Sequence, residues 1–255
     1  MATNINTQKV LSRRISGIDG IGGAIAFTDK YSISFDGSNE YLALSSVPLL
    51  GTLGTGDFSI SLWVNVTNLT GQGNQRLVTF GAGGSYQTAM AVNNTGNLTF
   101  SGPWSDQFAW GGTAGNWRHV IYRVNRQSIS NNVGFAVDGI IYDNKNFNTT
   151  GITFDTTGNG YIGRNAGSFN FAGNIDEIAV WTKYLTNAEC VEIYNSGVPT
   201  DLQASSVSAN LQSWWRMGDP GGPGSYPTIV DQESGNNATM TNMLGANITT
   251  NVPTV

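Results

Sequence analysis

Apolar and polar residues alternate along several short stretches of the chain, most clearly in DFSISLWVNV at residues 57–66. In an extended backbone, every second side chain points to the same face. One face therefore carries the apolar residues Phe58, Ile60, Leu62, Val64 and Val66, and the other carries Ser59, Ser61 and Asn65. This pattern predicts a β-strand with one face in the core and one face in water.

Shorter alternating stretches predict an all-β chain with little helix. They are separated by turns rich in glycine and asparagine, two of which, Asp36-Gly37 and Asp138-Gly139, are typical of hairpins. We expect strands near residues 31–35, 41–42, 76–80, 88–92, 98–101, 119–124 and 133–137. Many short strands at this spacing favour a sandwich of antiparallel sheets.

The stretch 160–197 predicts a central strand followed by one short helix. Apolar side chains occur on both faces of NIDEIAVW, so neither face is expected to meet water. Thr186 and Glu189 have the spacing of a capping box, and Gly197 supplies a left-handed stop. The single cysteine, Cys190, lies on the apolar side of this helix, which predicts a buried thiol and no internal disulfide.

The order GNIDEIAVW, then YLTNAECVEIYNSG, resembles the closing strand and helix of laminin-G-like domains. The resemblance extends to SISFDGSNEYLAL, DFSISLWVNV, GNWRHVIYRV and VGFAVDGIIYD, over residues 31–197. It implies a concanavalin A-like jelly roll, an all-β sandwich of two antiparallel sheets with one short helix and, in this chain, extended terminal arms. The function stays open, because relatives include lectins, glycan hydrolases and structural modules.

A second resemblance places the end of the chain in the same sandwich. WWRMGD and TIVDQESGNNATMTNM resemble the segment that usually opens a laminin-G-like domain, yet here they follow the closing helix. Such a circular permutation is physically reasonable because sandwich termini often lie close together. We expect an N-terminal arm at 1–30, one sandwich at 31–243 that residues 211–243 complete in permuted order, and a C-terminal tail at 244–255.

Composition narrows the classes of function. The net charge of −5 and the pI near 4.7 argue against a nucleic-acid binder, which needs a basic surface. The chain has no run of 18 apolar residues and no apolar core of a secretion signal near its start. We therefore expect no membrane partner and a protein that is made and kept, or packaged, in cytosol.

The predicted N-terminal arm combines Lys9, Arg13 and Arg14 with the glycine-spaced apolar run ISGIDGIGGAIAF. One interpretation is a frayed terminus. The other is a tether that docks on a neighbouring subunit or on a larger assembly, because disordered tails are seldom so apolar.

Three aromatic residues, Trp104, Phe108 and Trp110, fall in a stretch that is otherwise composed like a loop. They either fold down as a satellite core or form a platform that contacts sugar rings or a protein partner. Both interpretations stay open at the level of sequence.

The loop from Asp231 to Asn236 is rich in oxygen-bearing side chains and resembles a calcium loop of some laminin-G-like domains. Calcium takes six to eight oxygen ligands. Asp176 or Glu177 of the central strand could complete such a shell, with calcium as the cofactor. The alternative is an ordinary Asx turn with no ion.

The sequence predicts no catalytic site. Asp176 and Glu177 are adjacent, so a regular strand points them to opposite faces and away from one glycosidic bond. The Glu-x-Asp-x-x-Glu pattern of retaining hydrolases of this fold is missing, as are a P-loop, a dinucleotide fingerprint and an EF-hand loop. His119, the one histidine, is expected to be structural.

The arrangement of the chain's ending also resembles structural proteins of tailed bacteriophages. This resemblance implies a non-enzymatic virion protein, assembled in the host cytoplasm and displayed on the capsid or an appendage as a decoration, cement or fibre-type protein. Its partners would be other virion proteins and further copies of itself in a homo-oligomer. The alternative is a carbohydrate-binding lectin module for host or environmental glycans, and a glycan hydrolase is a third interpretation.

Overall fold

The computed structural model describes residues 27–44, 56–69, 73–81, 88–102, 105–148, 154 and 159–254. Trp104 and the three basic residues of the predicted arm, Lys9, Arg13 and Arg14, lie outside these residues. Within the described ranges, no helix is long and apolar enough to cross a membrane.

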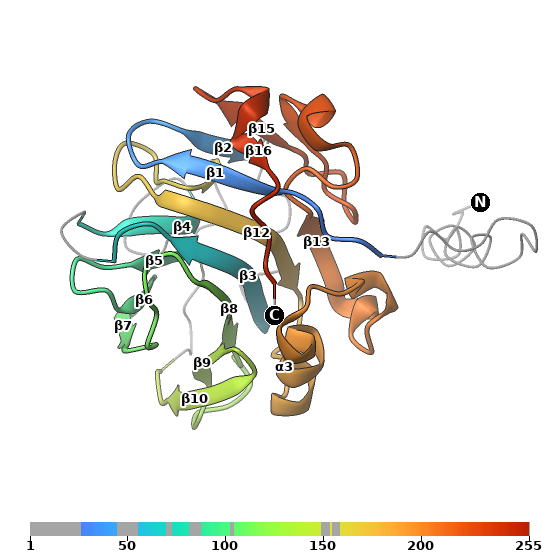
Figure 1. The fold of residues 1–255 in the computed structure, drawn as a ribbon. Helices are drawn as coiled ribbons and strands as arrows, with labels where there is room; N and C mark the ends of the chain where they lie inside the picture. The colour runs from blue at the N-terminus through green and yellow to red at the C-terminus, as the bar shows by residue number, and fades with distance from the viewer. Residues whose placement is uncertain are drawn as a thin grey trace, which may run out of the picture.

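Two antiparallel sheets pack face to face, as Figure 1 shows. Sheet A has the strand order β10 (Ile140–Lys145), β9 (Val133–Val137), β8 (Trp117–Val124), β3 (Phe58–Val66), β12 (Ala172–Trp181), β1 (Ser32–Asp36) and β16 (Ile248–Thr249), and β13 (Leu211–Trp215) also pairs with β12. Sheet B has the order β14 (Thr228–Ile229), β15 (Ala238–Thr241), β2 (Tyr41–Leu44), β11 (Gly160–Ile162), β4 (Gln75–Phe80), β5 (Thr88–Val92), β6 (Leu98–Ser101) and β7 (Ser105–Phe108). The predicted all-β jelly-roll class is confirmed.

Helical segments are short and follow the end of β12. In the described part of the chain, α3 (Asn187–Tyr194) is the only α-helix. The 3-10 turns are η1 (Asn195–Gly197), η2 (Leu202–Ala204), η3 (Ser208–Asn210), η4 (Gly222–Ser225) and η5 (Gly245–Asn247). The helix packs on the outer face of sheet A and gives the molecule a third layer.

The main core lies between the two sheets. The inward face of β3 carries the apolar side chains that its alternation predicts, and Phe58, Leu62 and Val64 have no exposed surface. Across the core, Tyr122 of β8 stacks on Phe100 of β6 with ring centroids 3.6 Å apart. Each large apolar side chain contributes about 1.5–3 kcal/mol when it is fully buried, so β3 is a leading contributor to stability.

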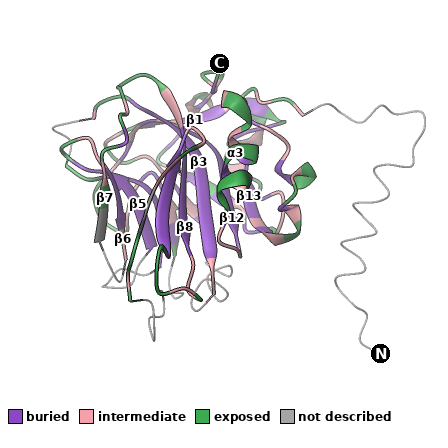
Figure 2. Ribbon diagram, turned by 90° about the horizontal axis from the view of Figure 1, so that it is seen from below, coloured by how far each residue is buried: buried purple, intermediate pink, exposed green. Residues whose placement is uncertain are grey.

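The outer face of sheet A is also buried, which corrects the prediction that Ser59 and Ser61 face water. Both serines are at most 1% exposed, because a second apolar cluster covers this face. In that cluster Trp181 of β12 is fully buried among residues that include Cys190 of α3. Figure 2 shows β3 and β12 as buried strands beside this helix.

His119 belongs to the same covered layer. Its ring centroid lies 4.9 Å from that of Trp63 and 6.0 Å from that of Tyr194. Burial lowers the pKa of His119 to about 3, so the imidazole is neutral near pH 7. The prediction of a structural histidine agrees with this placement.

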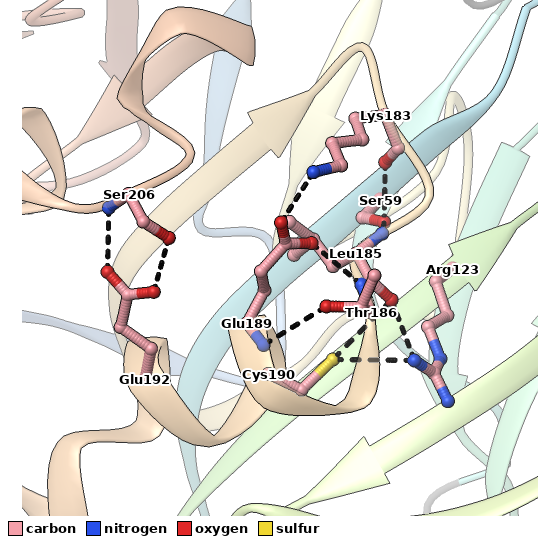
Figure 3. Close-up of polar contacts among 9 residues, drawn as sticks. All are labelled: Ser59, Arg123, Lys183, Leu185, Thr186, Glu189, Cys190, Glu192 and Ser206. Atoms are coloured by element: carbon pink, nitrogen blue, oxygen red, sulfur yellow. Dashed lines mark hydrogen bonds and ion pairs between the residues drawn. The ribbon is translucent and has the colours of Figure 1, made fainter.

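Helix α3 begins at the predicted capping box (Figure 3). The Thr186 hydroxyl accepts a hydrogen bond from the Glu189 backbone N–H at 3.3 Å, and the Glu189 carboxylate accepts one from the Thr186 N–H at 2.8 Å. Lys183 adds an ion pair to the same carboxylate at 2.5 Å. The helix ends before the predicted Gly197, because Asn195 already adopts a left-handed φ of 47° as the C-cap.

Two buried polar groups attach the helix to sheet A (Figure 3). Ser59 Oγ donates to the Lys183 carbonyl at 2.8 Å and accepts from the Leu185 N–H at 3.0 Å. Arg123 of β8 donates to the Leu185 carbonyl at 2.7 Å and lies 3.8 Å from the sulfur of Cys190. Cys190 has no exposed surface, so the predicted buried thiol is confirmed, and burial raises its pKa to about 11.

Residues after the helix belong to both sheets. Strand β13 pairs with β12, β15 with β2 and β16 with β1. The prediction of a C-terminal tail at 244–255 is wrong for the part around β16, because Ile248 is buried opposite Ile33 and Asn251 accepts a hydrogen bond from Ser32 at 2.6 Å. Phe27, from the predicted N-terminal arm, likewise packs against the second apolar cluster.

Candidate functional site

Strand β12 carries a β-bulge at its centre. The pairing register with β3 shifts between Asp176 and Ala179, and Glu177 adopts a left-handed φ of 46°. A bulge changes the direction of the side chains on the strand that contains it. Asp176 and Glu177 therefore lie together beside Asp29, which corrects the prediction that they point to opposite faces.

Four carboxyl groups meet at this bulge, and we call Asp29, Asp176, Glu177 and Asp219 the acidic cluster. Asp29 precedes β1, Asp176 and Glu177 come from β12, and Asp219 follows β13. Carboxylate oxygens of Asp29, Glu177 and Asp219 lie within 4.8 Å of one another. Sequence reasoning missed Asp29 and Asp219, because only the fold brings these distant segments to the bulge.

Hydrogen bonds hold one side of the cluster in place. Asp219 Oδ2 accepts from the backbone N–H groups of Lys30 at 2.9 Å and Tyr31 at 3.2 Å. Glu177 accepts from Arg216 Nε at 3.1 Å and from the indole N–H of Trp214. These donors fix the orientation of the carboxyl groups.

The opposite side of the cluster lacks donors. Asp176 Oδ1 accepts from the Glu177 backbone N–H at 2.8 Å, but its Oδ2 is buried with no hydrogen-bond partner. Asp219 Oδ1 and both carboxylate oxygens of Asp29 are also buried without a partner. Four oxygen atoms of three aspartates are thus shielded from water and receive no N–H donor. Asp29 lies within hydrogen-bonding reach of both Asp219 and Asp176, so these oxygens face one another.

Burial and mutual repulsion raise the pKa values in the cluster. Burial, together with the charge of Asp219, raises the pKa of Asp29 to about 7. Burial raises the pKa of Glu177 to about 8, although Arg216 opposes the shift, and burial together with Asp29 raises that of Asp176. Such shifts mean that the charged form of each group is costly here.

Two adjoining hollows lie next to the cluster. One, of about 350 Å³, is lined by residues that include Arg216 and Asp219. The other, of about 420 Å³, is lined by residues that include Phe27, Asp201 and Arg216. The guanidinium of Arg216 lies 4.3 Å from the Phe27 ring centroid, so this side chain stands between the hollows and the acidic cluster.

The predicted calcium loop is organised differently. Asp231 is buried, and its carboxylate accepts hydrogen bonds from the hydroxyls of Ser213 at 2.6 Å and Ser234 at 2.5 Å. It also accepts from the backbone N–H groups of Trp214, Glu233 and Asn236. A carboxylate with five donors has no lone pairs left for an ion, so this loop does not fit calcium.

The other proposed members do not complete that shell. The buried side chain of Asn236 has no hydrogen-bond partner for either its oxygen or its nitrogen. Asp176 and Glu177 interact with Asp29, and Asp231 is not among the charged groups that act on either of them. The four predicted ligands are therefore not one site.

The predicted aromatic platform is partly a satellite core. Trp110 is 4% exposed, and its indole N–H donates to the Gly96 carbonyl at 2.8 Å, which favours the satellite-core interpretation for this residue. Phe108 is half-buried and lies 4.2 Å from Tyr142 and 6.0 Å from Phe135, ring centroid to ring centroid. Its role in sugar or partner contact stays a prediction, and Trp104 lies outside the described residues.

A second candidate surface lies on the outer face of sheet B. Leu42 and Ile162 point into the core, so their neighbours Tyr41 and Tyr161 point outwards. The two tyrosine rings meet edge to face with centroids 5.8 Å apart, and the Arg164 guanidinium lies 4.2 Å from the Tyr41 ring. All three are half-buried, so part of each side chain meets solvent.

Arg76 of β4 lies on the same face, opposite Ala91. Its guanidinium lies 5.5 Å from the ring of Phe169 and donates to Ser101 Oγ at 3.2 Å, and its Nε has no partner. Small side chains, Ala43, Thr79, Ala89 and Ala91, form the floor around it. We call these small residues, with Tyr41, Arg76, Tyr161, Arg164 and Phe169, the sheet B platform.

The sequence has no match among curated proteins. Among solved structures, the chain is similar to a candidate carbohydrate-binding protein from Bacteroides ovatus, with a TM-score of 0.67 and 18% identity over 90% of this chain, which spans 62% of that one. It is also similar to the CBM40 of the Ruminococcus gnavus IT-sialidase, solved with α2,3-sialyllactose, with a TM-score of 0.50 and 15% identity over 65% of this chain and 96% of that one. Both likenesses concern the fold.

The sequence also matches the model of a known protein family. The model of the concanavalin A-like lectin/glucanases superfamily domain, Laminin_G_3, matches residues 36–190, which is more than half of the chain. The protein belongs to this family.

Proposed function

We propose that the protein is a glycan-binding module and that the sheet B platform holds the sugar. The observation that carries the proposal is the pair of part-exposed tyrosines, Tyr41 and Tyr161, with Arg164 stacked on them. The apolar face of a sugar ring packs on an aromatic ring, and a rigid aromatic side chain loses little entropy on binding. The platform offers this contact from two adjacent strands.

Polar groups beside the rings supply the hydrogen bonds that a sugar needs. Arg76 is 7% exposed, and it keeps a buried N–H without an acceptor. A ligand hydroxyl or carboxylate is the kind of group that would satisfy this donor. Ala89 and Ala91 beneath Arg76 have no exposed surface, so a sugar would contact the tyrosine rings and Arg76 and not the strand itself.

We infer binding rather than hydrolysis. Glycosidases place two carboxyl groups about 5–9.5 Å apart on either side of the scissile bond. The strands that form the platform, β2, β4, β5 and β11, contain no Asp or Glu, whereas the close carboxyl groups of the acidic cluster lie on the outer face of sheet A. A bound sugar on the platform would therefore meet rings and arginines instead of an acid–base pair.

Glycan-array binding of the purified full-length chain tests the proposal. We expect Tyr161→Ala to reduce binding about two- to tenfold, since one aromatic contact contributes about 0.5–1.5 kcal/mol. Phe108→Ala tests the predicted loop contact separately. Incubation of the bound glycans with the protein should release no shorter products.

The matched control is Tyr226→Ala, because Tyr226 is 43% exposed and lies outside the platform. Equal loss in both tyrosine variants, or no binding to any glycan by the native chain, would contradict the proposal. Display on a virion stays a prediction, and it requires that deleting residues 1–28 abolishes attachment to particles while glycan binding survives.

A further inference from the structure

We propose that the acidic cluster binds a hard divalent cation of the calcium class, with Asp29, Asp176 and Asp219 as direct ligands. This is a different site from the predicted loop at Asp231. It lies on the outer face of sheet A, on the far side of the sandwich from the sheet B platform, so it does not depend on the proposed function.

Charge is the first argument. Asp29, Glu177 and Asp219 converge at the bulge with Asp176 beside them. Among the described residues, the cationic group bonded to them is the guanidinium of Arg216, at 3.1 Å from Glu177 and 3.8 Å from Asp219. Buried carboxylates without a counter-charge are expensive, and proteins pair them or use them to coordinate metals. A divalent cation would remove the excess negative charge.

The second argument is independent of the number of acids and concerns unpaired oxygens. Asp176 has no exposed surface, and its Oδ2 is among the atoms that lack any donor. Asp29 contributes two such oxygens and Asp219 one. Carboxylate oxygens facing one another without donors are the ligands that calcium and similar hard cations require. Water or backbone carbonyls would supply the rest of the shell.

The surrounding contacts have the form of a supporting shell. Asp219 uses one oxygen for the N–H groups of Lys30 and Tyr31 and leaves the other free. Asp176 divides its two oxygens in the same way. Ligating carboxylates are commonly oriented by such outer hydrogen bonds. The left-handed Glu177 backbone that makes this geometry is a strained feature of the kind that clusters at functional sites.

The cluster is also reachable. Asp29 is only part-buried, and Asp219 lines the hollow of about 350 Å³. A hydrated ion could enter by this route and exchange some of its waters for carboxylate oxygens.

The test uses the full-length protein and two readouts. Elemental analysis after purification without chelator should find about one calcium per chain. After treatment with EDTA, melting curves with added calcium chloride should show Tm rising by several degrees and saturating, because a ligand of the folded state stabilises it by mass action.

Asp29→Asn and Asp219→Asn should bind no calcium at millimolar concentration and lose the Tm shift. Both variants remove a repelling charge, so we expect them to fold in EDTA. Asp201→Asn is the control, because Asp201 lines the neighbouring hollow but caps η2 instead of joining the cluster, and it should keep the native response.

The proposal would be overturned if the purified protein contained no metal and its melting curve were the same in EDTA and in calcium. The carboxyl groups of the cluster would then be neutralised by shared protons. Retention of the calcium response in both asparagine variants would also overturn it. Binding of zinc but not calcium would contradict the assigned class of cation.

Discussion

The loop at Asp231 and the acidic cluster are both rich in carboxylate oxygens, yet they differ in what surrounds those oxygens. Asp231 is enclosed by hydroxyl and N–H donors from the loop and from β13. Asp176 and Asp219 each keep a buried oxygen that no donor reaches. The difference shows that composition alone does not mark an ion site. An ion site is marked by the balance of hydrogen-bond donors and acceptors around the carboxylates in the folded protein.

The largest expected effect removes both regions at once. A chain that ends at Gly197 lacks Asp231, Asp219 and the strands β13, β15 and β16. Sheet A would lose the partner of the β12 end, and the buried Trp215 would be missing from the core. We expect an insoluble or molten product without cooperative unfolding. A sharp unfolding transition would show instead that both sites are additions to a self-sufficient sandwich.

Asp231→Ala should give the next largest effect, a loss of about 3 kcal/mol or more in the free energy of unfolding. The substitution leaves several buried donors unpaired, and each unsatisfied donor costs about 1–3 kcal/mol. Urea denaturation should give the same loss in EDTA and in calcium, because we infer a hydrogen-bonding role for Asp231. A loss of stability that occurs only in calcium-containing buffer would show instead that the loop at Asp231 binds the ion.

Stability in EDTA should depend on pH in a direction that the cluster sets. The folded-state pKa values of Asp29, about 7, and Glu177, about 8, lie above their ordinary values. Between pH 6.5 and 8 the folded state therefore binds more protons than the unfolded state, and the free energy of unfolding falls as pH rises. His119 opposes this trend only at the lower end of the window, because its pKa is about 3 in the folded state but an ordinary 6.5 in the unfolded chain, which takes up part of a proton there. That fraction is smaller than the proton uptake of Asp29 and Glu177 in the folded state, so the direction of the slope stands.

Urea denaturation at pH 6.5 and pH 8 measures this slope. Calcium should flatten it, because a bound cation stabilises the ionised carboxylates that the higher pH creates. A flat or rising profile in EDTA would mean that the carboxyl groups of the cluster ionise freely in the folded state.

The sequence predicts the regular parts of the fold well and the site poorly. The period-two pattern of β3 identifies Leu62 as core, and the spacing of Thr186 and Glu189 identifies the start of α3. Both patterns depend only on residues close together in the sequence, so they can be recognised without knowledge of the fold. The same pattern misplaces Ser59, because the layer that covers it comes from residues more than 120 positions away.

The acidic cluster escapes prediction for two physical reasons. A bulge breaks the alternation at Glu177, and alternation is the rule on which the opposite-face prediction for Asp176 and Glu177 depends. In addition, Asp29 and Asp219 are 190 positions apart, so no spacing motif links them. The platform tyrosines are different, since Tyr41 and Tyr161 occupy outward positions of short strands that the alternation of YLAL and GYI could have indicated.

The smallest expected effect is a change in the free energy of unfolding that has opposite signs in the acidic cluster and in the loop at Asp231. In EDTA, Asp29→Asn should raise the free energy of unfolding by about 0.5–1 kcal/mol at pH 8, because it removes a like charge from a buried cluster while keeping the side-chain shape. Asp231→Asn should lower it, because a neutral amide cannot accept from the same five donors. Urea denaturation of both variants at pH 8, with and without calcium, checks the pair. In calcium the benefit of Asp29→Asn should reverse, since native protein gains the ion and the variant does not. If Asp29→Asn were destabilising in EDTA as well, its carboxylate would be held by donors as Asp231 is, and the contrast between the two regions would disappear.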